Sequence, residues 1–205
     1  MFRKKITITV SLLSLLLFLN ACSMMTSNKT SSNDTTTTAS QIKPKNEELR
    51  LNFNKVQLGV IDNDAKGGTS LKELETLFGQ PDEHTTQQGG DVTLDVYTWR
   101  KDETIIVTQL YADSTIAKSI SNFRFIRENK VGLTEYNDIQ NGMSFQEAIE
   151  KLGEPDVMSQ AVSSDGEEIS AIWSSGIKSN NTNANIQLDF KNNSLTNKSQ
   201  LGLVK

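Results

Sequence analysis

A match of the chain to itself constrains its fold more than any other feature of the sequence. The segment Gly68–Glu73 (GTSLKE) recurs as Gly142–Glu147 (GMSFQE), and a Gly-x-Pro-Asp segment follows each copy. Trp99 recurs as Trp173 at the same spacing, and 8 of the 32 positions from Gly68 to Trp99 are identical in the two copies. Average residue usage would give roughly two identities by chance. The sequence therefore predicts an internal duplication.

Both copies carry the start and stop signals of a helix. Each begins with Ser-x-x-Glu, at residues 70–73 and 144–147. In this capping box the serine oxygen accepts from the N3 amide, and the glutamate reaches back to the serine N–H. Apolar residues follow at helical spacing, and Gly79 and Gly153, each with a proline two positions later, should end the helices.

Beyond the two prolines the apolar residues alternate with polar ones, which is typical of half-buried strands. A shorter helix is expected before each capped one, near residues 53–58 and 136–141. One copy holds few large apolar residues, so two copies should share a core. The sequence predicts an α+β fold of two tandem repeats, each a helix-loop-helix packed on a three- to four-stranded antiparallel sheet.

The N-terminus has the features of an export signal. Residues 1–5 are basic, and the mainly apolar run 6–19 leads into Leu19-Asn20-Ala21-Cys22. As a helix that run would span roughly 21 Å, which is short of the ~30 Å hydrocarbon core and typical of a signal peptide.

The segment that ends in Cys22 resembles the lipobox of bacterial lipoproteins. This resemblance implies a diacylglyceryl group on the Cys22 sulfur and cleavage between Ala21 and Cys22. Two acyl chains make a stable anchor, whereas one binds only marginally. We therefore expect the protein on the extracytoplasmic face of the cell membrane, with the membrane as one partner.

The polar stretch after Cys22 is rich in Ser and Thr and cannot bury enough apolar surface to order itself. We interpret it as a disordered tether. The predicted organisation is a signal peptide (1–21), lipidated cysteine and tether (22–46), first repeat (47–127, with an insertion near 60–68) and second repeat (128–205).

Charge and composition exclude several kinds of function. The net charge is −4, and loss of the three basic residues of the leader would make it −7. An acidic chain without basic clusters is a poor nucleic-acid binder. The single cysteine and single histidine exclude an internal disulfide and leave too few ligands for a Cys/His zinc site. We expect no cofactor and no nucleic acid.

Two segments carry a family resemblance. Residues 136–144, followed by Gly153-Glu154-Pro155, resemble the helix-loop-helix opening of the β-lactamase-inhibitor-protein-like fold, which the small lipoprotein of the outer-membrane β-barrel assembly machinery shares. Residues 197–203 are similar to a Gram-positive lipoprotein family of unknown function with this fold. The resemblance implies a concave sheet face that grips another protein, but members of the family do unrelated things.

Three aromatic residues are candidate contact residues. Trp99 and Trp173 are equivalent in the self-match, and Tyr97 lies two positions before Trp99. Core packing is one interpretation. The other places them on an open sheet face as anchors for a partner, since Trp and Tyr often dominate interface energy.

A calcium loop is a weaker candidate. Asp62, Asp64 and Glu73 fall at loop positions 1, 3 and 12. Lys66, however, puts a cation at position 5, where an oxygen ligand is needed, and Glu73 is already explained as a capping residue. A polar insertion that binds no metal is the alternative.

The leading hypothesis is a non-catalytic interaction module, anchored outside the cell, for a protein or an envelope component. One alternative is an envelope-active enzyme or accessory factor that uses acidic residues and His84, although we expect His84 itself to be a solvated loop residue. The other is a small solute-binding lipoprotein.

Overall fold

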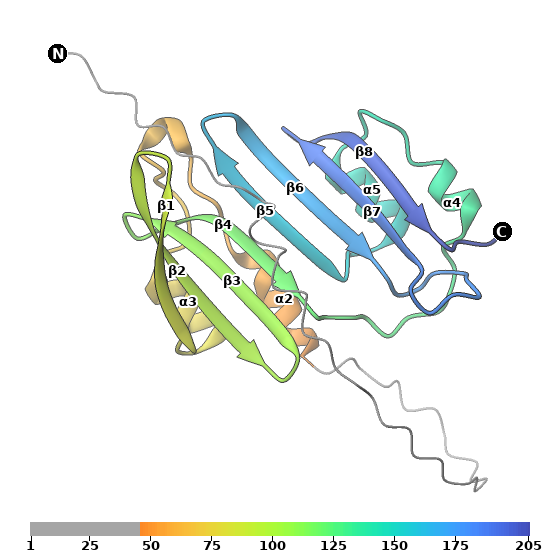
Figure 1. The fold of residues 1–205 in the computed structure, drawn as a ribbon, viewed down its shortest axis with the longest axis horizontal. Helices are drawn as coiled ribbons and strands as arrows, with labels where there is room; N and C mark the ends of the chain where they lie inside the picture. Colours follow the sequence, from red (N-terminus) through yellow and green to blue (C-terminus); the bar gives the residue numbers. More distant parts are fainter. Residues whose placement is uncertain (1–45) are drawn as a thin grey trace, which may run out of the picture.

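The computed structural model describes residues 46–205, and its centre is a single antiparallel sheet of eight strands (Figure 1). Each strand pairs with its neighbours in sequence order. The strands are β1 (Glu83–Gly89), β2 (Val92–Lys101), β3 (Thr104–Tyr111), β4 (Ser114–Ser121), β5 (Val157–Ser163), β6 (Gly166–Trp173), β7 (Asn185–Lys191) and β8 (Ser194–Leu201).

The helices of the described region all lie against one face of this sheet (Figure 1). Two precede β1 and two precede β5, and a short 3-10 turn lies between the first two. They are α2 (Glu47–Lys55), η2 (Ile61–Asn63), α3 (Leu71–Phe78), α4 (Leu133–Asn137) and α5 (Phe145–Leu152).

The predicted architecture of two repeats, each with its own three- to four-stranded sheet, is wrong. Strands β4 and β5 pair antiparallel, from Ala117 opposite Ala161 to Ile120 opposite Met158, and so join all eight strands into one layer. The hydrophobic periodicity and the turn signals specify where strands lie, but they do not specify which strand edges pair. Pairing with β5 satisfies the edge of β4, whose backbone N–H and C=O groups would otherwise lack partners. The self-match therefore describes two stretches of one sheet.

The predicted starts and ends of the two capped helices, α3 and α5, are confirmed. The hydroxyls of Ser70 and Ser144 accept from the N3 amides at 3.4 and 3.3 Å, and the N3 glutamates accept from the serine N–H groups at 2.8 Å. Gly79 and Gly153 follow the last helical residues with φ of 85° and 76°, a left-handed conformation that costs glycine little. The helices that precede them begin earlier than predicted, at Glu47 and Leu133. The first of these, α2, has nine residues and is longer than α3, which has eight, so the prediction of a shorter helix holds only for α4.

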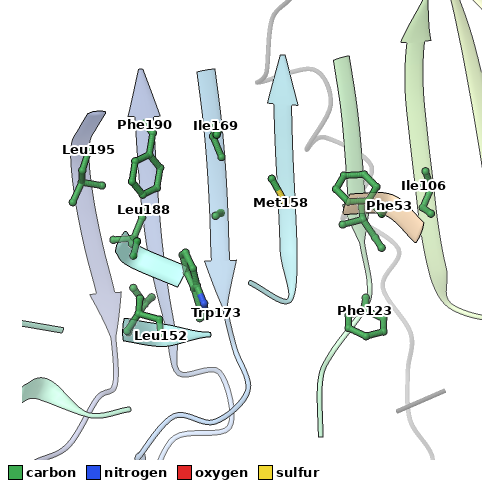
Figure 2. Packing of buried hydrophobic residues seen from close by; sticks show 14 of the residues in the cluster. Phe53, Ile106, Phe123, Leu152, Met158, Ile169, Trp173, Leu188, Phe190 and Leu195 are labelled. Carbon is green, nitrogen blue, oxygen red and sulfur yellow. The ribbon is translucent and has the colours of Figure 1, made fainter. Parts of the chain in front are cut away.

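The core lies between the helices and the sheet. It is continuous across the first half of the folded part (residues 47–127) and the second half (residues 128–205). Figure 2 shows Met158 on β5 between the aromatic group of the first half and that of the second. The largest members of this cluster include Phe53, Trp99, Phe123, Leu152, Trp173, Leu188 and Phe190. The two halves thus share one hydrophobic core, as expected for sequences too short in apolar residues to fill two.

The segment that contains the predicted insertion folds back on β4. Gly59 N–H donates to the Thr115 carbonyl at 2.8 Å, and Thr115 N–H donates to the Thr69 carbonyl at 3.1 Å. A Cβ on Gly68 would collide with the Thr115 backbone. Ala65 closes a second, smaller apolar cluster with Leu94 and Ile116, so the segment covers sheet surface that the helices leave open.

The indole N–H of Trp173, a core residue, donates to the Gly153 carbonyl at 2.8 Å and so holds α5 against the sheet. We predict that Trp173→Phe lowers the free energy of unfolding by about 2–3 kcal/mol, because that carbonyl loses its donor and part of the indole volume is left empty. Urea titration followed by far-ultraviolet circular dichroism measures the loss. The half-buried Tyr97 provides the control: Tyr97→Phe should cost less than about 0.5 kcal/mol. Equal costs for the two variants would contradict the role given to the indole.

Candidate functional site

The sheet has one face that the described helices do not cover, and this helix-free face is the candidate site. Because side chains alternate along a strand, the neighbours of the buried Trp99 and Trp173 point to it. The strand register aligns its central row as Glu83, Thr98, Val107, Ser119, Ser159, Ser170, Asp189 and Asn197.

The middle of the helix-free face carries only small side chains. Over the four residue pairs that join β4 to β5, the side chains on this face are alanine and serine: Ala117, Ser119, Ser159 and Ala161. Larger apolar residues flank them, with Ile105 on β3 and Ile172 on β6, both half-buried. The side chains are therefore small along the centre and larger on both sides, and the four central ones are at most 5% exposed.

Most charged groups on this face are already paired. Glu168 accepts from Lys191 at 3.4 Å, and Arg100 donates to Glu83 at 3.5 Å. The Asp189 carboxylate accepts from Ser170 at 2.7 Å and from Asn197 at 3.0 Å. These contacts leave a polar, nearly neutral surface without a strong field of one sign.

Two buried polar atoms on this face have no hydrogen-bond partner in the described part of the chain. They are the Gln109 side-chain oxygen and the Ser159 hydroxyl, while a third such atom, the Thr108 hydroxyl, belongs to the helix-covered face. An unsatisfied buried polar group costs roughly 1–3 kcal/mol. The centre of the helix-free face therefore holds hydrogen-bonding capacity that the described fold does not use.

Both tryptophans that the sequence offered as contact anchors lie in the core. Trp99 is 3% exposed and Trp173 is 1% exposed. Each indole N–H donates to the carbonyl of the glycine that ends a helix, Gly79 or Gly153, at 2.8 Å. The indoles therefore hold α3 and α5 against the sheet.

Tyr97 and His84 form a stacked aromatic pair at the β1 edge. Their ring centroids are 4.5 Å apart, and His84 Nε2 lies 2.8 Å from a carboxylate oxygen of Asp95. Burial raises the pKa of the Tyr97 hydroxyl, and neighbouring acidic groups add to the shift. His84 is thus in a strand rather than the loop that the sequence suggested.

The calcium candidate does not assemble around Glu73. Its carboxylate accepts from the Ser70 N–H at 2.8 Å and from the Ser70 hydroxyl at 2.7 Å. Those bonds lower the pKa of Glu73. Asp64 lies just after η2 in a left-handed conformation, and the Asp62 side chain lies outside what the structure describes. Within the described residues no group of three or more acidic, His or Cys side chains is placed to hold a metal ion.

The predicted lipidation and cleavage residues, Ala21 and Cys22, lie outside the described residues. Between residues 46 and 205, no helix combines the length and apolar character needed to cross a membrane.

A buried arginine that the sequence did not reveal joins the two halves. The Arg50 guanidinium on α2 is fully buried and donates to the Pro155 carbonyl at 3.1 and 3.3 Å. It also forms a 3.2 Å ion pair with Glu154. Burial lowers the pKa of Arg50, and the Glu154 charge opposes that shift.

At the same junction, Asp156 holds residues 125–127, which follow β4, next to residues 174–175, which follow β6. Its buried carboxylate accepts from the backbone N–H groups of Phe125, Ser174 and Ser175 at 2.7–2.8 Å, and from Arg127 at 3.2 Å. Burial pushes the pKa of Asp156 up, but the hydrogen bonds and Arg127 outweigh it and hold the pKa below its ordinary value. The group is saturated with donors, so its role is structural.

Two lysines of the sheet bind the ends of the first helix in each half. Lys118 Nζ donates to the Phe53 and Val56 carbonyls at 3.3 and 2.7 Å. Lys198 Nζ donates to the Tyr136 and Ile139 carbonyls at 3.2 and 2.6 Å. Burial, with Arg50 nearby, lowers the pKa of Lys118 to about 8.

The structure thus defines an α+β protein whose open antiparallel sheet is covered by helices on one side. Residues 45–203 match the family described as "Domain of Unknown Function with solved-structure structure (DUF3862)". The match spans most of the chain, and the protein belongs to this family. No functionally curated protein matches the chain.

A solved structure is also similar. It is the crystal structure of a protein from Streptococcus mutans that carries the provisional description of a beta-lactamase inhibitor protein. The two share 47% sequence identity with a TM-score of 0.75, over 79% of this chain and 100% of the other. The predicted resemblance to β-lactamase-inhibitor-like proteins is confirmed to that extent.

We predict that the free energy of unfolding rises by about 1–2 kcal/mol between pH 8 and pH 9.5. In that window the unfolded chain keeps a proton on the Lys118 amine, whereas the folded chain with a pKa of about 8 loses it. The unfolded state therefore binds more protons, and stability increases with pH. Urea titrations at the two pH values measure the change.

The matched controls are Lys118→Met and Lys198→Met. The first variant lacks the amine responsible and should show no rise, whereas the second retains Lys118 and should keep it. A rise that persists in Lys118→Met would show that another group causes it.

Proposed function

We propose that this protein is a non-catalytic module that binds a protein partner on the helix-free face of its sheet while a lipid on Cys22 anchors it outside the cell membrane. The observation that carries the proposal is that face: a sheet of eight strands whose helices all lie on one side. Its small central side chains and larger flanking ones offer a surface for a chain segment rather than an enclosed pocket for a solute.

The similar Streptococcus mutans protein supports a protein partner. Its provisional description as a β-lactamase inhibitor protein names a function that works by contact with an enzyme. A β-lactamase is accordingly the first candidate partner to test, and other exported proteins follow. The paired charges of the helix-free face favour a partner recognised by shape and hydrogen bonds.

The position of Asn46 supports the tethered arrangement. Its side-chain amide donates to the Lys101 carbonyl at 3.1 Å and to Asp102 at 3.2 Å, at the turn between β2 and β3. The polar segment after Cys22 therefore joins the folded part at an end of the sheet.

The first test uses a photoreactive amino acid at Ile172, on the helix-free face, in the full chain in its host cells. We predict a cross-linked protein adduct from this position, because a half-buried apolar flank of an interface contacts the partner directly. Gln146, exposed on α5 behind the sheet, is the matched control position and should give none. Adducts of equal yield from both positions would contradict the assignment of the face.

The partner captured at Ile172 then allows a binding measurement. Ile172→Lys should weaken binding on the order of tenfold or more, because it forces an unpaired charge into the interface. Gln146→Lys adds the same charge on the opposite side and should leave the dissociation constant unchanged.

The anchor is tested separately with Cys22→Ser. Without the sulfur no diacylglyceryl group can be added, so we expect loss of metabolic labelling by a fatty-acid analogue and a shift of the mature protein from membranes to the medium. Ser23→Ala is the control and should remain labelled. A Cys22→Ser protein that stays labelled would overturn the anchor and leave the binding face untouched.

A further inference from the structure

The sheet has two open edges that lie at opposite ends of the same layer. In the strand order of residues 46–205, β1 and β8 each pair with a strand on one side only. Seven strand-to-strand steps of ~4.8 Å place these edges roughly 34 Å apart. An exposed edge with unpaired N–H and C=O groups is a template for another strand.

The edge of β8 repeats the environment of β4, which is paired inside the fold. Lys118 on β4 and Lys198 on β8 bind the carbonyls at the ends of α2 and α4 in the same way. Both strands also receive the loop that precedes the capped helix, through Gly59 N–H to Thr115 and Gly142 N–H to Leu195. The two strands therefore correspond position by position, with Lys198 in the place of Lys118.

The edge of β1 repeats the environment of β5, at the spacing of the self-match that relates Trp99 to Trp173. Each strand follows a Gly-x-Pro-Asp segment whose glycine accepts from a buried tryptophan. Each is then the first strand of a hairpin, paired with β2 or β6. Inside the chain, β4 pairs with β5. Because β8 corresponds to β4 and β1 corresponds to β5, the outer edges of β8 and β1 have the features that make this pairing, but neither edge pairs with a strand in the described chain.

The side chains along the two edges do not prevent such a pairing. Residues 85–88 of β1 are Thr-Thr-Gln-Gln, without the lysine or proline that commonly guards an edge. On β8 the single charged side chain, Lys198, is turned toward α4. At the end of β8, Leu201 is 51% exposed, an apolar side chain without cover on the described surface.

We infer that the outer edge of β8 pairs antiparallel with the outer edge of β1 in a second copy of the chain. Transfer of the β4–β5 register places Ser199 opposite Thr85 and Asn197 opposite Gln87 of that second copy. The contact uses different surfaces on the two copies, so it is head-to-tail and continues from copy to copy.

This contact is weaker than its internal counterpart. Leu133 stands at the position of Arg50 in the second half, so the hydrogen bonds that Arg50 gives to Pro155 have no equivalent. Four residue pairs also cover far less than the roughly 1,600 Å² of a standard stable interface. The association therefore depends steeply on protein concentration.

The test is disulfide trapping in the full chain with Cys22→Ser, which has no other cysteine. Added Ser199→Cys and Thr85→Cys lie too far apart in one molecule to join, since a disulfide needs Cα atoms within about 7 Å. Mild oxidation should therefore give a ladder of dimers and larger species. The control, Ser199→Cys with Gln88→Cys, moves the second thiol three positions along β1, roughly 10 Å out of register, and should give several-fold less.

A ladder from the in-register pair alone supports the pairing of β8 with β1. Equal cross-linking from both pairs, whether low or high, overturns it, as does efficient dimerisation of Ser199→Cys alone, which would mean that two β8 strands pair with each other. Because Leu201→Glu adds charge at the edge without touching the core, it should reduce the in-register ladder and leave the unfolding midpoint unchanged.

Discussion

The pairing of β4 with β5 is the contact on which the rest of this structure depends. Its four residue pairs turn two groups of four strands into one layer, and the core continues beneath them through Met158. Arg50 and Asp156 reinforce the same junction with donors and acceptors drawn from both halves. Because a buried guanidinium is costly unless it is fully hydrogen-bonded, the halves cannot separate there without exposing or stranding these groups.

A continuous sheet with helices on one side has a direct consequence for recognition. The helices cover one face of the sheet. The other face is formed by the side chains that alternate with the core positions along each strand. In the centre these are small, so the face is set by the size of side chains on β4 and β5, the same strands that make the junction. The candidate site therefore lies where the two halves of the sheet join.

Local signals predicted the local structure well. Ser-x-x-Glu specified both helix starts, because an N-cap is decided within four residues. Prediction from the sequence failed where distant segments meet. No periodicity indicates that β4 pairs with β5. The burial of Arg50 was not predicted either, because the Pro155 carbonyl that accepts its hydrogen bonds is 105 residues away in the sequence. The family resemblance implied an open sheet face, but the small side chains at its centre were not predicted, since they come together only where β4 pairs with β5. Trp99 and Trp173 were recognised as a pair, but only the fold shows that their indoles face the helices.

The two buried indoles also make the protein its own reporter. The chain contains two tryptophans, each hydrogen-bonded to a glycine carbonyl in a different half. Indole fluorescence shifts to longer wavelength when water replaces such an environment, so a chain that retains only one tryptophan reads out the opening of one half. Comparison of the two emission signals would show whether the eight strands unfold as a unit or in two stages.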